Sequence, residues 1–220
     1  MIITFASQKG GTACSVLSTN IAVLRAIREP ESKILIVDTD TQGSSYDWNL
    51  ERLELGINPG IECIKLKGKH LIEEIDELEK IFTDIVVDVG GKDSEELRLA
   101  LLMADNLIVP TLPSQFDLWA LEFIDKIIPE CRKAGNKNLT GNILFTRVST
   151  HPLLGKAEVE EATLAIEDFE YLSPMKSVIR ERNVFRKSSR SGIAVEEITP
   201  SDKKAKLELN ELFWEIYGEA

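Results

Sequence analysis

The sequence predicts an α/β fold, in which a doubly wound, mostly parallel sheet is flanked by helices on both faces. Two observations support this prediction. Apolar runs of strand length alternate with segments of helical periodicity along nearly the whole chain. Several runs, such as residues 34–37 and 85–87, are rich in valine and isoleucine on both faces, as buried parallel strands are. We therefore expect right-handed crossovers between parallel strands.

The apolar runs are the predicted strands. The first of them is Ile-Ile-Thr-Phe-Ala, and the others have a similar length and apolar content. They lie at residues 2–6, 33–38, 60–66, 83–89, 106–110 and 142–146. Ligands of such sheets bind beyond the carboxyl ends of the strands, so the loops that follow them are the places to search for a site.

The intervening segments carry apolar residues at helical spacing. They lie at residues 16–27, 71–80, 94–103, 116–134 and 156–168, and a closing helix is expected at 202–217. Trp48, Trp119 and Trp214 are expected to be packing residues. No repeat or long linker interrupts the pattern, so residues 1–220 are expected to form a single domain.

Composition limits the class of protein. The formal net charge is -11, which argues against a surface coated uniformly for nucleic acid. No apolar run approaches the roughly 20 residues that a membrane-spanning helix needs, and no secretion signal is visible. Cys14, Cys63 and Cys131 have no metal-ligand spacing and read as free thiols. A cytoplasmic location is expected.

The loop after the first strand, residues 7–15, has the composition of a phosphate-binding loop. Small residues there let backbone N–H groups turn toward phosphate oxygens, and the following helix adds its positive dipole end. Ser15, at the start of that helix, is placed to offer its hydroxyl to Mg²⁺. For the loop alone, an ordinary glycine-rich βα turn is the less favoured alternative.

Lys9, Gly10, Gly11 and Ser15 resemble the deviant P-loop of the ParA/MinD family, Lys-Gly-Gly-x-Gly-Lys-Ser/Thr, in which a signature lysine precedes the glycines. The resemblance is closest to short plasmid-type ParA partition proteins. It implies ATP and Mg²⁺ as cofactors and a catalytic role for Lys9, reaching across a dimer. The cofactor-binding loop residues that it implies are Gly10, Gly11, Thr12, Ala13, Cys14 and Ser15.

Two loop positions depart from the family pattern. Ala13 replaces the third glycine, and Cys14 replaces the P-loop lysine that normally neutralises the β- and γ-phosphates. A thiol is shorter and neutral when protonated, so Cys14 cannot do the work of that lysine. By motif position, Lys9 and Lys92 are the nearest cations that could replace it.

Further motifs follow in the order of the family. Asp38-Thr39-Asp40 is similar to its switch I motif, which implies that Asp40 is catalytic and positions water in the Mg²⁺ shell. Asp88 ends a strand like a Walker B aspartate, so the implied metal ligands are Ser15, Asp40 and Asp88. Arg147 follows the strand at which the family approaches the base, and is an expected cofactor-binding residue.

A basic segment stands out in this acidic chain. Residues 175–190 hold six basic side chains and one acid, a net of +5. Non-specific DNA contact through phosphates is predicted there; salt bridges with the surplus acids are the alternative. The candidate DNA-binding residues are Arg180, Arg182, Arg186, Lys187 and Arg190. The lysines at 203–206 are expected to be a solvated helix start, and the acidic C-terminus argues against membrane attachment.

The resemblance implies a partition or positioning protein, which forms a homodimer on ATP binding and engages non-specific DNA and a ParB-like or other adaptor. Association with the nucleoid would follow. A pseudo-ATPase scaffold is the alternative that Cys14 suggests, and any activity of the chain as an enzyme is expected to be weak and partner-stimulated. A P-loop ligase or synthetase would share the fold, but the sequence shows no motif for a second substrate pocket.

Overall fold

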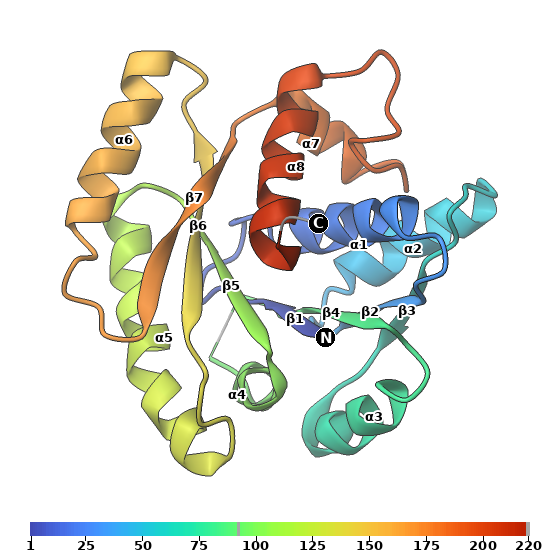
Figure 1. Ribbon diagram of the computed structural model, residues 1–220, viewed down its shortest axis with the longest axis horizontal. Helices are drawn as coiled ribbons and strands as arrows, with labels where there is room; N and C mark the ends of the chain where they lie inside the picture. The colour runs from blue at the N-terminus through green and yellow to red at the C-terminus, as the bar shows by residue number, and fades with distance from the viewer. Residues whose placement is uncertain (92, 219–220) are drawn as a thin grey trace.

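The computed structural model describes residues 1–91 and 93–218, and within them seven parallel strands form one sheet (Figure 1). The strands lie in the order β3-β2-β4-β1-β5-β6-β7. Their bounds are β1 Ile2–Phe5, β2 Ile34–Asp38, β3 Glu62–Lys65, β4 Asp84–Asp88, β5 Asn106–Thr111, β6 Gly141–Val148 and β7 Leu172–Arg180. The predicted parallel α/β sheet is confirmed.

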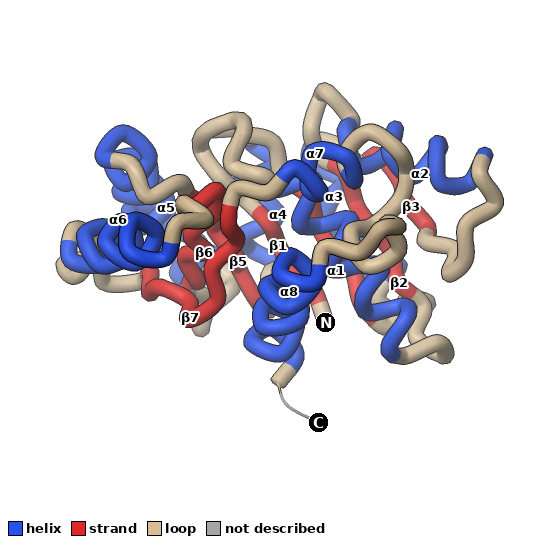
Figure 2. The backbone as a smooth tube through the Cα atoms, turned by 90° about the horizontal axis from the view of Figure 1, so that it is seen from above, coloured by secondary structure: helices blue, strands red, loops and turns tan. Residues whose placement is uncertain are grey.

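The helices cover both faces of this sheet, as Figures 1 and 2 show. On one face lie α1 Cys14–Arg28, α2 Ser44–Glu54, α7 Asn183–Ser188 and α8 Lys203–Tyr217. On the other lie α3 Leu71–Leu78, α4 Glu95–Met103, α5 Gln115–Ala134 and α6 Pro152–Leu164, with the short 3-10 helix η1 Gly68–His70 before α3. The fold is therefore doubly wound.

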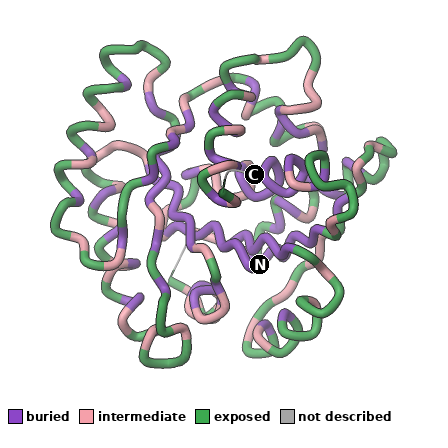
Figure 3. Tube along the Cα trace, in the orientation of Figure 1, coloured by how far each residue is buried: buried purple, intermediate pink, exposed green. Residues whose placement is uncertain are grey.

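Alternation along the strands supplies two hydrophobic cores. In β1, Ile3 and Phe5 pack toward α1 and α8, whereas Ile2 belongs to the core under α3 to α6. All these side chains are buried, and the sheet is the buried layer in Figure 3. Burial on both faces explains why the strands read as continuous apolar runs.

One strand and two α-helices were not predicted, nor was the short η1. The edge strand β7 contains Pro174 and Lys176 and exposes several side chains, so it lacks the apolar run of its neighbours. The helix α2 follows Gly43, whose φ of 68° starts the turn, and has few buried residues. The short α7 lies in the segment interpreted only as basic, and α6 begins at Pro152 rather than at residue 156.

The tryptophan prediction holds for only part of the set. Trp48 is buried and its indole nitrogen donates to the Ser188 carbonyl oxygen at 2.8 Å. Trp119, by contrast, is 55% exposed on α5, so its prediction as a packing residue is wrong. The reason is that α5 carries more apolar residues than its buried face uses.

The segment after β7 is tied down to α1 and α2. Asn20 donates to the Ser188 hydroxyl at 3.1 Å and accepts from the Val195 amide at 2.7 Å. Buried Arg52 forms two 2.7 Å bonds with the carboxylate of Glu197. Such a buried pair fixes geometry, because the loss of one partner would leave the other charge buried alone. The segment is thus held over the carboxyl edge of the sheet.

In the part of the chain that the structure describes, no helix has both the length and the apolar content to cross a bilayer. All strand ends that carry the predicted motifs lie at one edge of the sheet. Phe5 and Asp38 are both in register with Asp88, on its two sides. The loop after β1 therefore meets the acids that end β2 and β4.

Candidate functional site

The loop between β1 and α1 curls around the start of α1. Gly11 has φ 84° and Ala13 has φ 83° with ψ 19°, so both lie in the left-handed region. Glycine adopts that region without penalty, but alanine does so at a cost of about 1–2 kcal/mol. The left-handed backbone at this position explains why the family pattern has a glycine there. Ala13 adopts the same left-handed region although it is not a glycine.

Two contacts fix the loop in place. Buried Thr146, at the end of β6, donates to the carbonyl oxygen of Thr12 at 3.1 Å. Gly91 lies against the loop from the other side: a Cβ added to it would come within 2.6 Å of the Gly10 nitrogen. A side chain is excluded there, so the backbone after β4 packs directly against the loop backbone.

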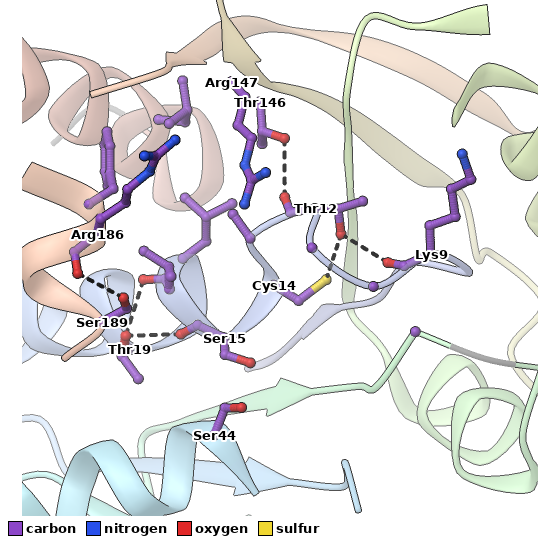
Figure 4. A pocket seen from close by; sticks show the side chains of 18 of the residues that line it. Lys9, Thr12, Cys14, Ser15, Thr19, Ser44, Thr146, Arg147, Arg186 and Ser189 are labelled. Atoms are coloured by element: carbon purple, nitrogen blue, oxygen red, sulfur yellow. Dashed lines mark hydrogen bonds between the residues drawn. The ribbon is translucent and has the colours of Figure 1, made fainter. Parts of the chain in front are cut away.

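A pocket of about 430 Å³ opens above the loop (Figure 4). The loop residues form its floor, and basic residues from the carboxyl ends of β6 and β7 and from the segment after β7 form its opposite wall. Its size falls within the range of small-molecule sites. Among the residues that line it are Gly10, Cys14, Ser15, Asp40, Arg147 and Arg186.

The acid predicted at the end of β4 lies directly beneath the loop. Asp88 is buried and accepts a hydrogen bond from the Ser45 hydroxyl at 2.6 Å. Burial raises the pKa of Asp88 to about 7, and hydrogen bonds from Ser45 and Ser15 partly oppose that rise. The charges of Asp38 and Asp40 add to it. The charged form of Asp88 is therefore disfavoured, mainly because the carboxyl is buried.

Asp40 completes the acidic side of the pocket. A Cβ at Gly90 would come within 2.8 Å of its carboxyl carbon, so the absent side chain makes room for this acid. Asp38 instead accepts from the amides of Asp40 and Tyr46, each at 3.0 Å, and supports the turn. Burial raises the pKa of Asp38 as well. The structure thus brings Ser15, Asp40 and Asp88 to one place.

This arrangement fits Mg²⁺ in the way that nucleotide sites use it. No cluster of three or more metal-ligating residues exists among residues 1–91 and 93–218. Mg²⁺ keeps several waters and is commonly held by one or two carboxylates plus substrate phosphates, so such a cluster is not needed. A divalent cation would also offset the charge repulsion between Asp88 and its neighbours Asp38 and Asp40.

Cys14 supplies no charge to this pocket. Desolvation of the thiol raises the pKa of Cys14 to about 12, and the nearby Asp88 acts in the same direction. Its sulfur lies 3.6 Å from the Thr12 hydroxyl oxygen. At neutral pH the side chain is therefore a neutral thiol, as the sequence predicted.

Lys9 does not replace the missing lysine within its own chain. Its ammonium group lies 3.2 Å from the Asp117 carboxylate and above the ring of Phe116, 5.9 Å from its centre. Figure 4 shows the side chain directed away from the pocket. The second predicted cation, Lys92, lies outside the described residues.

The predicted DNA-binding residues fall into two groups. Arg180 and Arg182 both bond to Glu208 of α8, with the shortest contact 2.6 Å from Arg182, and Glu208 is buried. Arg186 forms an ion pair with Glu181 at the pocket rim. Lys187 and Arg190 are exposed near the end of α7.

Several site residues were missed by the sequence analysis. Ser45 holds Asp88, Asp117 holds Lys9, Thr146 holds the loop and Glu208 holds two arginines. Thr146 could have been found, because it directly precedes the predicted Arg147 at the carboxyl end of a strand. The others depend on contacts between distant segments and left no local pattern.

The fold and the loop are similar to those of P-loop proteins of the ParA/MinD type, and the expected resemblance is confirmed by the relatives of the chain. No family model matches it. The chain is 28% identical, over 74% of its length and 70% of the relative, to the maintenance of carboxysome distribution protein A (McdA) of Gloeobacter kilaueensis. Its counterpart in Halothiobacillus neapolitanus is 22% identical over 97% and 95% of the two chains. A ParA family protein of Mycoplasma genitalium is also similar, at 22% identity over 74% and 77%.

Solved structures show the same fold. Cyanothece McdA without nucleotide has a TM-score of 0.76 at 13% identity, covering 98% of this chain and 99% of its own. A plasmid partition protein of Borrelia burgdorferi, bound to AMPPNP, has a TM-score of 0.72 at 20% identity and covers 98% of both chains. The parallel sheet with helices on both faces therefore has the ParA/MinD fold.

The strain at Ala13 gives a prediction about stability. Ala13→Gly removes the left-handed penalty while adding backbone freedom to the unfolded chain, so we expect the free energy of unfolding to rise by about 0.5–1 kcal/mol. Urea denaturation would measure it. As a matched control, Ala157→Gly in the exposed interior of α6 should lower the free energy by about 1 kcal/mol. A loss of stability in Ala13→Gly would contradict the strain.

The raised pKa of Asp88 gives a prediction about pH. The folded state holds its proton up to about pH 7, whereas the unfolded chain releases it near the ordinary value, so stability should fall as pH rises from about 4 to 7. Asp88→Asn should flatten that fall in urea denaturation series without Mg²⁺ or nucleotide. Asp76→Asn, on the exposed side of α3, is the control and should keep the wild-type profile. Equal slopes in wild type and Asp88→Asn would disprove the burial of a titrating acid.

Proposed function

We propose that the chain is a nucleotide-dependent positioning protein, which binds ATP with Mg²⁺, forms a sandwich dimer and engages non-specific DNA and an adaptor protein. The observation that carries the proposal is the convergence of one loop and two acids. The Gly10–Gly11 segment, Ser15 and Asp40 line one pocket, and Asp88 is buried directly behind Ser15, to which it is hydrogen-bonded. The names of the relatives support a role in positioning a cargo.

Each residue has a physical role in this proposal. The loop amides and the positive end of α1 would hold the phosphates. Ser15 and Asp88 would hold the metal, directly or through water, and Asp40 would orient the attacking water. When bound, Mg²⁺-ATP supplies the transferable phosphoryl group. The close packing of Gly91 on Gly10 would couple the state of the pocket to the segment after β4.

The face around Lys9 supports dimerisation. Phe116 is 69% exposed and packs edge-on against the ring of the exposed Trp119, with 5.4 Å between the ring centres. Exposed aromatic residues of this kind are typical anchors of protein interfaces. Lys9 lies beside them and is directed out of its own pocket, as a residue that serves the nucleotide of a partner would be. Its salt bridge with Asp117 would be exchanged for phosphate contacts.

A second candidate function is a pseudo-ATPase: a nucleotide-binding scaffold without turnover. Neutral Cys14 favours it, because phosphoryl transfer depends on a cation at that position. In this case the fold, the pocket and the dimer face would be retained, and the nucleotide would act as a structural ligand. Hydrolysis measured with DNA and an adaptor present separates the two functions: any multiple-turnover hydrolysis rejects the scaffold.

The missing lysine gives a prediction about affinity. Calorimetry should detect Mg²⁺-ATP binding to the wild type. Cys14→Lys should tighten it about tenfold or more, because a charge-assisted hydrogen bond contributes roughly 1.5–3 kcal/mol. Cys14→Ala, which also lacks a charge, should match the wild type. If no variant binds nucleotide, the proposed function is wrong.

The basic segment gives a prediction about DNA. Lys187→Ala and Arg190→Ala should each weaken binding of duplex DNA in the presence of Mg²⁺-ATP, and should each reduce the slope of log affinity against log salt by about 1. Lys204→Ala, on exposed α8, removes the same charge elsewhere and should change neither quantity. Anisotropy titrations at several salt concentrations measure both. An unchanged slope in the first two variants would exclude the segment as the DNA site.

A further inference from the structure

Most of the basic residues around the pocket already have an acidic partner. Lys9 pairs with Asp117, and Arg186 pairs with Glu181. Arg180 and Arg182 share Glu208, a buried residue of α8. Such pairs hold their side chains in place and cancel much of their charge at short range. They are therefore poor substitutes for the lysine that Cys14 replaces.

Arg147 differs from all of them. Within residues 1–91 and 93–218, no carboxylate pairs with its guanidinium group, although the residue lines the pocket. Arg147 is exposed, and Figure 4 shows its guanidinium reaching down toward the loop, between Arg186 and Thr12. A guanidinium group stays charged at any relevant pH and presents several donors in one plane. An uncompensated charge of this kind is suited to an anionic ligand.

The backbone is built to aim this side chain. Arg147 has φ 53°, one of two non-glycine residues in the described part of the chain with a positive value, and Ala13 of the loop is the other. It also lies at a shift of register, because Thr146 pairs with Ile179 while Val148 pairs with Arg180. A bulge of this kind redirects a side chain, and strained backbone of this kind is concentrated at ligand sites.

The preceding residue anchors the bulge on the loop itself. Thr146 donates to the carbonyl oxygen of Thr12 at 3.1 Å, two residues before Cys14. The strained Arg147 is thereby held near Cys14, the position at which the P-loop pattern has a lysine. Two independent departures from ordinary sequence and geometry, the neutral Cys14 and the re-aimed Arg147, thus meet at one pocket.

We propose that Arg147 supplies, within the same chain, the positive charge toward the nucleotide phosphates that the P-loop lysine would otherwise supply. This rests on the proposed function, in that the ligand is a nucleoside polyphosphate. Arg147 then binds the polyphosphate chain. Its position in the sequence had suggested a contact with the base instead. The guanidinium fork suits two phosphate oxygens at once.

A double-mutant cycle tests the proposal. Mg²⁺-ATP affinity is measured by calorimetry for the wild type, Cys14→Lys, Arg147→Ala and the double variant. Arg147→Ala should weaken binding about tenfold or more when Cys14 is present. In the Cys14→Lys background the same change should cost less than about threefold, because the introduced ammonium group already meets the phosphates.

Three further measurements sharpen the cycle. Arg147→Lys keeps the charge and the Cβ, so it should retain most of the affinity that Arg147→Ala loses. Lys133→Ala, on the exposed end of α5, removes a charge elsewhere and should have no effect. AMP, which has one phosphate, should be much less sensitive to Arg147→Ala than ATP. Urea denaturation of each variant checks that the fold is intact.

The outcomes separate this inference from the function on which it rests. If the wild type and Cys14→Lys both fail to bind nucleotide, the proposed function fails. If ATP binds but Arg147→Ala costs the same factor in both backgrounds, the function stands and the inference is overturned, because Arg147 then contacts the base or ribose. Equal losses for AMP and ATP would overturn it in the same way.

Discussion

The buried carboxyl of Asp88 is the constraint on which the rest of the site depends. It ends β4 between β1 and β2, in register with Phe5 and Asp38, so the strands that flank it bring the loop and a second acid to it. Ser45 of α2 holds it at 2.6 Å, and the desolvation that raises its pKa leaves it poised to accept a cation. A charge that is costly alone becomes favourable beside a divalent metal. In the proposed function, a bound Mg²⁺ would therefore compensate the cost of the buried Asp88 carboxylate.

Close backbone contacts connect the surroundings of Asp88 to neighbouring segments of the chain. Gly90 and Gly91 leave room for Asp40 and for the loop, and a side chain at either position would push them apart. If a metal binds beside these acids, a change in its ligands would therefore displace the backbone after β4 directly, because no flexible side chain lies between them. On the other side of the loop, Thr146 connects it to β6 and Arg147. The loop is thus held between the ends of β4 and β6. When ionised, Asp88 contributes a negative charge from one side, and Arg147 contributes a positive charge from the other.

Features formed by residues close together in the sequence could be predicted, whereas features formed by contacts between distant residues could not. The sheet, the loop and the acids Asp40 and Asp88 were predictable because each is a short local pattern that follows an apolar strand. The strand β7 was not, because Pro174 and Lys176 break the apolar run at the edge of the sheet. The bulge at Arg147 depends on its pairing with β7, and so could not be read either. The partner of Arg182 was hidden for the same reason, since Glu208 lies 26 residues away.

The basic segment shows what such hidden contacts do to a charge argument. A net of +5 over residues 175–190 suggested one cationic surface. In the folded chain Glu208 is buried against Arg180 and Arg182, and these two arginines become part of the support for the pocket wall. Among the predicted DNA-binding residues, Lys187 and Arg190 near the end of α7 are exposed and form no ion pair within the described residues, so they keep their field for a ligand in solvent. A charge run in sequence thus divides into two groups: arginines whose ion pairs support the wall of the pocket, and exposed basic residues whose charge is open to solvent.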